Sequence, residues 1–310
     1  MADVEGFSIA VDSEDRAVHP TIRALSGIVT LFVPEEAQFK HPVRLRWEYP
    51  ECGEETTVRM NVGKSARLML IEELVTVAGT RNTKTAFQWT HTMEIILSES
   101  AQVEFVSAQT ASASVQLTLK QRSHLSDNAK IMWRNITLGA HTVDHDLLSE
   151  LHGSDAVSEI DWVFYAKDEE KYRLHARNIF NGRRGGGEIT MKGVAEEKGH
   201  VQCDGMIEIG NGGTGTDTYL TQDVLMLDKT AKVDAIPGLE IKTNDVRASH
   251  SATVSRVTDE NLFYFAARGI IEKEARRMFV EGFLGEMVER IGDRAVREET
   301  LASVKGKYGT

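Results

Sequence analysis

The sequence predicts a mainly β protein, built as a right-handed parallel β-helix (β-solenoid) core with a C-terminal α-helical segment. Three observations predict this fold class: short alternating strands, a recurring corner motif, and an abrupt change to helical composition after Val257. We therefore expect an N-terminal segment over 1–27, a parallel β-helix core over 28–257 and a helical domain over 258–310.

The strands are predicted from short runs rich in Val, Ile, Leu, Thr and Phe, which Gly, Asn, Asp or Ser interrupts every few residues. Several runs alternate apolar and polar side chains, among them 43-VRLRWEY-49, 114-SVQLTL-119 and 205-GMIEIG-210. Alternation with a period of two is typical of a half-buried strand, because successive side chains point to opposite faces.

The corner motif consists of one or two polar residues, an Ala and then an alternating strand. It recurs in 35-EEAQFK-40, 64-KSARLMLI-71, 98-SESAQVEFV-106, 127-DNAKIMW-133 and 228-DKTAKVD-234. Early copies are roughly 30 residues apart, a spacing typical of stacked coils. We expect each coil to add one layer, with the small Ala at a tight corner. A plain antiparallel sandwich is the alternative.

The C-terminal helices are predicted from capping residues and apolar periodicity. Thr258 and Asp259 suit a helix N-terminus, and Gly269 suits the left-handed position after a short helix. Residues 271–292 then form an amphipathic pattern, with these side chains near one face: Ala275, Met278, Phe279, Gly282, Met287 and Ile291. We expect a further helix over 293–305, followed by a flexible tail.

Composition argues against several classes of partner. The formal net charge is -11, from 47 acidic and 36 basic side chains, and no basic run is present to bind nucleic acid. The acidic N-terminus is unlike a signal peptide, and no segment approaches the ~20 apolar residues of a membrane span. We expect a cytoplasmic protein that does not bind membranes. Cys52 and Cys203 form no C-x-x-C pattern, which argues against a disulfide framework or a structural zinc site.

Two motifs suggest a ligand. The stretch 210-GNGGTG-215 matches the dinucleotide fingerprint G-x-G-x-x-G, but an alternating, strand-like segment follows it, so we expect a turn between coils and no bound nucleotide. His141 and His145 would form a zinc or iron pair on a helix. On a strand they would lie about 13 Å apart. Because 146-DLLSELHG-153 is compatible with a helix, both alternatives stay open.

Enzymatic motifs are absent from the sequence. It contains no G-x-S-x-G, H-E-x-x-H or P-loop. Ser249, His250 and Ser251 are adjacent, and neighbouring strand residues face opposite ways, so they do not form a nucleophile–base pair. We expect a protein that is not an enzyme. A β-helix enzyme acting on carbohydrate, which would need a groove of carboxylates, is an alternative.

A longer stretch, 232–287, resembles the C-terminal core of the SufB/SufD family of iron-sulfur cluster assembly proteins. The resemblance rests on an ordered series of short motifs: Pro237 to Ile241, Asp245 with Val246, Ser249 to Thr253, Phe263 with Tyr264, Arg268 to Ile270, and Gly282 with Phe283. Looser, collinear similarity extends upstream through 221–235 and 68–74. The resemblance covers most of residues 28–290.

The family resemblance implies a parallel β-helix followed by helices that dock on SufC, an ABC-type ATPase. The chain lacks the long helical N-terminal region of larger members, so it resembles their short, stand-alone archaeal and bacterial type. Such a version is expected to form a homodimer through the β-helix. SufB-type members carry a cysteine and a Glu-His-Glu triplet where this chain has Gln222, Asp223 and Ser249-His250-Ser251. The pattern is closer to SufD.

The resemblance also implies site residues. His250 and Cys203 are the candidate ligands of a transient iron-sulfur cluster, which would be the only cofactor. The candidate ATPase-interface residues are Phe263, Tyr264, Arg268, Phe279 and Phe283. The chain is thus expected to act as a cluster scaffold or as the partner of a scaffold, and an interaction-only subunit that never binds a cluster is the alternative.

Overall fold

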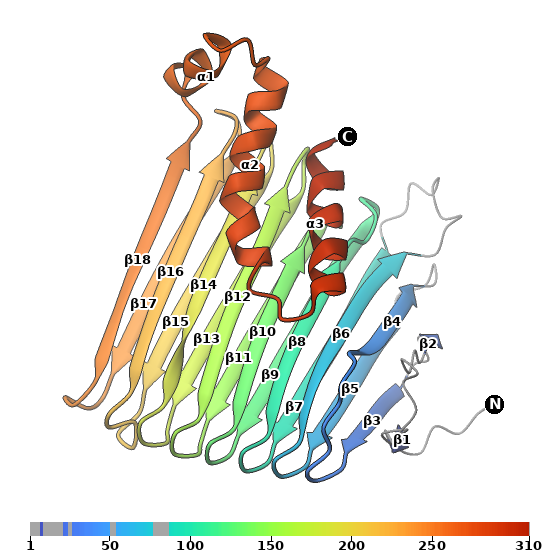
Figure 1. Ribbon diagram of the computed structural model, residues 1–310, viewed down its shortest axis with the longest axis vertical. Coiled ribbons are helices and arrows are strands. Elements are labelled where there is room, and N and C mark those ends of the chain that lie inside the picture. The colour runs from blue at the N-terminus through green and yellow to red at the C-terminus, as the bar shows by residue number, and fades with distance from the viewer. Residues whose placement is uncertain (1–6, 9–20, 24–26, 50–53, 77–86, 310) are drawn as a thin grey trace.

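The chain folds as a two-sheet β-solenoid with three helices, seen in a computed structural model that describes residues 7–8, 21–23, 27–49, 54–76 and 87–309 (Figure 1). Each coil contributes one strand to each sheet. In the described ranges the odd-numbered strands form one nine-stranded sheet, here called the odd sheet, and the even-numbered strands form another, the even sheet. The mainly β, solenoid fold class is confirmed.

The odd sheet consists of β1 (Phe7–Ser8), β3 (Gly27–Val33), β5 (Glu54–Val62), β7 (Phe87–Leu97), β9 (Val115–Leu125), β11 (Thr142–Leu151), β13 (Lys171–Phe180), β15 (His200–Ile209) and β17 (Lys232–Ile241). The even sheet consists of β2 (Thr21–Arg23), β4 (Val43–Tyr49), β6 (Arg67–Thr76), β8 (Gln102–Gln109), β10 (Lys130–Thr137), β12 (Val157–Ala166), β14 (Gly186–Ala195), β16 (Asp217–Met226) and β18 (Arg247–Arg256). Neighbouring strands pair in parallel throughout, so the antiparallel sandwich is wrong.

The recurring Ala lies at a corner between strands, as predicted, and Ala66, Ala101 and Ala129 lead directly into even strands, whereas Ala231 precedes β17 of the odd sheet. Ala101 and Ala129 are fully buried there. The residue before Ala101 and before Ala129 has a left-handed backbone, with φ of 60° at Ser100 and 56° at Asn128. This conformation turns each N–H toward the adjacent coil, where Ser100 donates to the Asp127 carbonyl at 2.9 Å and Asn128 donates to the Ser154 carbonyl at 2.9 Å. The corner motif therefore connects the coils as well as turning the chain.

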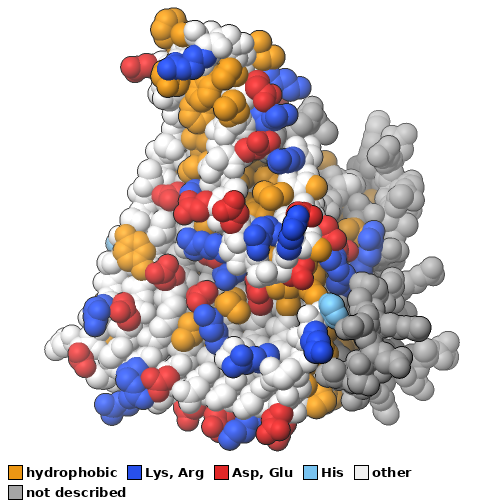
Figure 2. All heavy atoms as spheres, in the orientation of Figure 1, with side chains coloured by type: hydrophobic (Ala, Val, Ile, Leu, Met, Phe, Trp, Pro, Cys, Tyr) orange, Lys and Arg blue, Asp and Glu red, His pale blue; other side chains and the backbone are white. Residues whose placement is uncertain are grey.

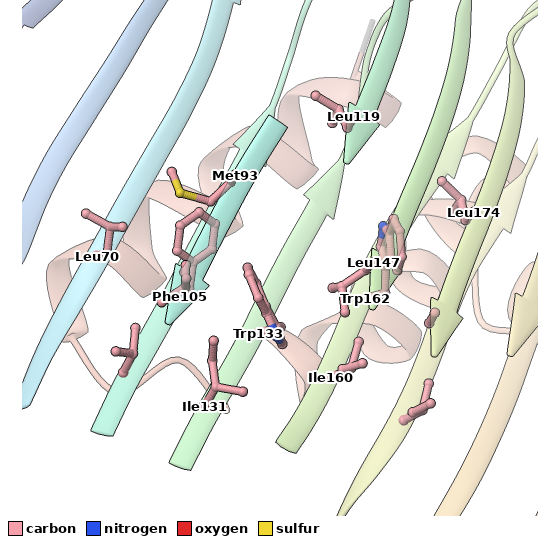
Figure 3. Packing of buried hydrophobic residues seen from close by; sticks show 14 of the residues in the cluster. Leu70, Met93, Phe105, Leu119, Ile131, Trp133, Leu147, Ile160, Trp162 and Leu174 are labelled. Atoms are coloured by element: carbon pink, nitrogen blue, oxygen red, sulfur yellow. The ribbon is translucent and has the colours of Figure 1, made fainter. Parts of the chain in front are cut away.

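The main core fills the space between the two sheets, where aromatic side chains of the even strands meet aliphatic side chains of the odd strands (Figure 3). Phe105 and Trp133 pack with their ring centroids 4.9 Å apart, and both are fully buried. Odd strands such as β11 alternate strictly between buried and half-buried residues. In β12 every residue from 160 to 166 is buried on both faces, because helices cover the outer face of the even sheet.

Three helices follow the last strand: α1 (Asp259–Ala266), α2 (Glu272–Val288) and α3 (Arg294–Gly309). Helices α2 and α3 lie across the even sheet, whereas α1 projects beyond the strand ends (Figure 1). Buried apolar side chains of α2, including Val280 and Leu284, belong to the same cluster as Tyr165 of β12. Arg290 adds an ion pair to the buried Asp161 at 2.9 Å. Packing and charge together hold α2 against the sheet.

Three local predictions differ from the structure. Residues 146–151 continue β11, so the helical alternative for this stretch is wrong. The predicted flexible tail is instead the last turn of α3, where Val304 is buried and Lys307 pairs with Glu170. The buried face of α2 includes Val280 and Leu284, while Met278 is 43% exposed. Packing against the even sheet explains both the helical C-terminal tail and the buried face of α2.

Candidate functional site

The last coil of the solenoid is open at its end. Strands β17 and β18 are the terminal strands of the two sheets, so no described strand pairs with their outer edges. Their side chains are mostly exposed or half-buried, unlike those of the preceding coil. Ile236 is 53% exposed, Ile241 43% and Val254 46%. A coil end with exposed apolar side chains and unpaired strand edges is a surface suited to pairing with another β-structure.

His250 lies in this open coil, at the middle of β18. Its register partner in the adjacent strand is Leu220, which is fully buried between the sheets. Paired residues of parallel strands share a face, so the imidazole points toward the space between the sheets. It is nevertheless exposed, because no described coil stacks over it. His250 is therefore accessible from the open end of the solenoid.

Cys203 lies one coil deeper, on β15, and its side chain is fully buried. Its Sγ is 3.7 Å from the Asp234 carbonyl oxygen, while Gln222 donates to the Cys203 carbonyl at 3.0 Å. Burial, with smaller contributions from Asp204 and Asp234, raises the pKa of the thiol to about 12. The thiol is protonated at neutral pH, and only the thiolate binds metal well. Cys203 thus becomes a ligand only if the last coils rearrange.

His141 and His145 do not form a metal pair. His145 is a residue of β11, and His141 immediately precedes this strand. Four residues along a strand span about 13 Å, too far for a shared ion. The ring of His145 is buried against Trp162 with a centroid distance of 4.4 Å, and neither ring nitrogen has a hydrogen-bond partner. The strand alternative of the sequence analysis describes this pair correctly.

Helix α1 and the start of α2 present exposed aromatic and apolar side chains, which gather at the projecting tip (Figure 2). Phe263 is 74% exposed, Tyr264 56% and Ile271 71%. Arg268 lies over the Tyr264 ring at 3.6 Å and donates to the Tyr264 carbonyl. The tip therefore combines aromatic area with a cation.

The other two predicted interface residues lie lower on α2 and are partly buried. Phe279 packs against Phe265 of α1 with a centroid distance of 5.3 Å. Lys192 of β14 lies over the ring of Phe283 at 4.7 Å. These two phenylalanines fix α2 to α1 and to the even sheet, so they support the exposed tip.

The glycine-rich stretch 210–215 forms the turn between β15 and β16, as predicted. Gly215 has a φ of 81°, and its N–H donates to the Asp245 carbonyl of the next coil. A strand follows, so the turn provides no helix N-terminus to hold a pyrophosphate.

The sequence analysis missed one group of potential metal ligands. His124, Glu150 and His152 come together on the outer face of the odd sheet. The alternation around 150–152 places Glu150 and His152 on one face, but the position of His124 beside them depends on the register between coils.

In the described part of the chain, no helix is long and apolar enough to span a membrane.

Residues 53–283 match the SufBD core domain of the SUF system of iron-sulfur cluster assembly. The chain belongs to the SufBD family. The matched region begins at β5 and ends in α2, so it contains the open coil, the projecting α1 and most of α2. The family resemblance of the sequence analysis is confirmed.

Three relatives show how this SufBD chain compares in length. It is 26% identical over 288 residues to "Protein ABCI7, chloroplastic" of Arabidopsis thaliana, covering 90% of this chain and 60% of that protein. It is 28% identical over 185 residues to the iron-sulfur cluster assembly protein SufD of Escherichia coli, covering 58% of this chain and 43% of SufD. A SufBD family protein of Mycobacterium leprae is 26% identical over 304 residues, covering 94% of this chain and 74% of that protein. The chain thus spans less than two thirds of the first two relatives.

Proposed function

We propose that this chain is a SufB/SufD-type subunit of an iron-sulfur cluster assembly complex, in which it acts without enzymatic activity as a scaffold or as the partner of a scaffold. The observation that carries this proposal is the open last coil, which presents an accessible His250 directly before the helices. Family membership supports the assembly role. A carbohydrate-processing enzyme finds no comparable support.

A second copy of the chain is the proposed partner at the open coil. Exposed edge strands usually acquire a covering partner or charged residues that prevent pairing. Strands β17 and β18 carry exposed Ile236, Ile241 and Val254 beside exposed charged residues such as Asp234 and Arg247. A homodimer through this end would bury these side chains and bring two copies of His250 close to the same interface.

His250 is the proposed ligand of a transient cluster at that interface. Iron-sulfur clusters are normally held by several thiolates, and the buried, protonated Cys203 provides none in this conformation. Imidazole ligation from two chains would be weak, which suits a cluster that must leave again. Rearrangement of the last coils would add Cys203 as a further ligand.

The projecting tip is the proposed docking surface for a SufC-like ABC ATPase. Phe263 and Tyr264 offer large aromatic area at low entropic cost, and aromatic residues with Arg dominate many interfaces. Arg268 holds the Tyr264 ring by a cation–π contact. Phe279 and Phe283 contribute by keeping α1 and α2 in place.

The proposed docking surface is joined to the proposed cluster site by very few residues. Strand β18 ends at Arg256, and α1 begins at Asp259 after the N-cap Thr258. Movement of α1 by two ATPases that associate on binding nucleotide would therefore act on β18, the strand that carries His250. The chain needs no bound nucleotide of its own for this coupling.

The docking proposal is tested by co-purification of the full chain with its ATPase. Deletion of 258–310 is a poor test, because it would uncover the apolar outer face of the even sheet. Phe263→Glu is preferable, since this side chain is 74% exposed and contributes little to folding. The matched control is Ile28→Glu, at a β3 position that is 63% exposed. Loss of ATPase capture in Phe263→Glu alone supports docking, and equal capture in both variants contradicts it.

The cluster proposal is tested by anaerobic reconstitution with iron and sulfide. The spectrum of the bound cluster is compared between the wild type, His250→Ala and the control His200→Ala, whose imidazole pairs with Asp234 at 3.0 Å. A change in the His250 variant alone supports ligation. If the wild type binds no cluster while it still captures the ATPase, the chain is an interaction-only subunit.

A further inference from the structure

A second site lies on the outer face of the odd sheet, away from the open coil. His124 of β9, Glu150 of β11 and His152, which follows β11, each direct one ligand atom to a common point, and these atoms lie within 4.8 Å of one another. Two of the side chains are half-buried, and His152 is exposed. It is the one such group among the residues that the structure describes.

The solenoid itself produces this arrangement. His124 and Glu150 are register partners in adjacent parallel strands. Glu150 and His152 are two residues apart, so they share a face of the sheet. The rings of His124 and His152 are stacked, with centroids 5.9 Å apart and planes 6° from parallel. The three side chains therefore form a compact triangle on a rigid surface.

The distances suit a metal ion of small radius. Ligands bonded at about 2.0–2.2 Å to one ion lie roughly 3 Å from each other, and His124 Nδ1 is 3.0 Å from Glu150 Oε2. Only His152 must approach, and its exposed side chain is free to rotate by the small amount required. Two imidazoles and one carboxylate are a common ligand set for Zn²⁺ and for non-haem Fe²⁺.

A carboxylate also lies near the other ring nitrogen of His124. Metal-binding histidines usually donate their other ring N–H to a carboxylate. The Nε2 atom of His124 is 3.8 Å from Glu94 Oε1, which is too long for a hydrogen bond but close enough for one to form after a small rotation of the ring. Arg59 holds the other oxygen of Glu94 at 2.7 Å. The nearby Arg122 is paired with Asp146, which reduces the repulsion of an incoming cation.

We propose that His124, Glu150 and His152 bind one divalent transition-metal ion of the Zn²⁺ or Fe²⁺ type, with Glu94 orienting His124 and water occupying the remaining positions. This site is separate from His250 and does not depend on the proposed assembly function. The three protein ligands leave positions open for exchange.

The same sheet contains a matched control. His175 Nδ1 is 2.9 Å from Asp204 Oδ2, and both side chains have exposures similar to those of His124 and Glu150. This pair is not part of any three-ligand group among the described residues. A His175→Ala variant therefore removes a surface imidazole–carboxylate pair without removing the proposed site.

The experiment is calorimetric titration of the untagged, metal-stripped 310-residue chain with Zn²⁺, repeated with Fe²⁺ under anaerobic conditions. We expect one ion per chain. His124→Ala and His152→Ala should weaken binding by at least about tenfold, and Glu94→Gln by about tenfold with unchanged stoichiometry, as for other outer partners. His175→Ala should bind like the wild type. Melting temperatures of the metal-free variants confirm that each is folded.

Three results would overturn the proposal. They are a wild type that takes up no ion or no more than His152→Ala does, equal losses in His152→Ala and His175→Ala, or a loss that follows His250→Ala instead. In the last case the ion binds at the open coil. None of these results affects ATPase capture, so failure of this site and failure of the proposed function are distinguishable.

Discussion

The buried imidazole of His145 should make the stability of this protein depend on pH. Its side chain is 1% exposed within the solenoid, and neither ring nitrogen has a hydrogen-bond partner. Burial, together with smaller electrostatic contributions from His91, Arg122 and His175, lowers its pKa from 6.5 to about 3. The neutral form is therefore strongly preferred in the folded state.

The sign and size of the effect follow from proton linkage. Below pH 6.5 the unfolded chain binds a proton at His145 that the folded chain does not bind until about pH 3, so acidification favours unfolding. Between pH 7.5 and 5.0 this single group should lower the free energy of unfolding by about 2 kcal/mol. The stability is fully present above pH 6.5 and is lost progressively as the pH falls toward 3.

His145→Leu removes the titrating group and the two unpartnered nitrogens. Urea unfolding at pH 7.5 and 5.0 should show a free-energy loss on acidification that is about 2 kcal/mol smaller than in the wild type. At pH 7.5 the variant should gain about 1–3 kcal/mol. His141→Leu, at a half-buried position before the strand, is the control and should keep the wild-type pH dependence. The same acid-induced loss in His145→Leu and the wild type would refute the reasoning.

Three further substitutions test the fold. Ala129→Leu should destabilise the protein by about 1–3 kcal/mol in urea because the corner is fully buried, whereas Ala302→Leu, at an exposed position of α3, should change stability by less than about 0.5 kcal/mol. Trp133→Ala should cost about 3–5 kcal/mol by guanidinium unfolding, since the ring is fully buried and donates to Ser149. Thr258→Ala removes the capping box of α1 and should cost about 1 kcal/mol, seen as faster amide exchange confined to α1. Uniform exchange across α1 and β18 would contradict a local cap.

Much of the solenoid is predictable because its signals are local. Period-two alternation identifies the strands, and the polar–Ala corner identifies where each coil turns, since the left-handed residue and the small buried Ala are adjacent in sequence. Capping at Thr258 likewise marks α1. The tail of α3 was missed because its helix depends on distant partners, among them Glu170, which pairs with Lys307.

For the candidate site residues, too, sequence motifs indicate the residue and the fold determines its exposure. Family motifs made His250, Phe263 and Tyr264 candidates, yet their exposure is a property of position, since β18 ends the sheet and α1 projects past it. The burial of Cys203 also follows from its place one coil inside the open end. The alternation of apolar and polar residues along a strand does not show whether another coil covers that strand or whether it lies at the end of the solenoid.

The sequence by itself determined the family, the strand period, the corners and the helical C-terminus, because each depends on residues close together in the chain. Only the tertiary structure decided which side chains meet. His124 and Glu150 are 26 residues apart and contact each other because the register between β9 and β11 pairs them. The physical reason is that the number of residues in each coil sets the register between its strands and those of the next coil. A shift of this register by one residue would turn the side chains of the shifted strand to the opposite face.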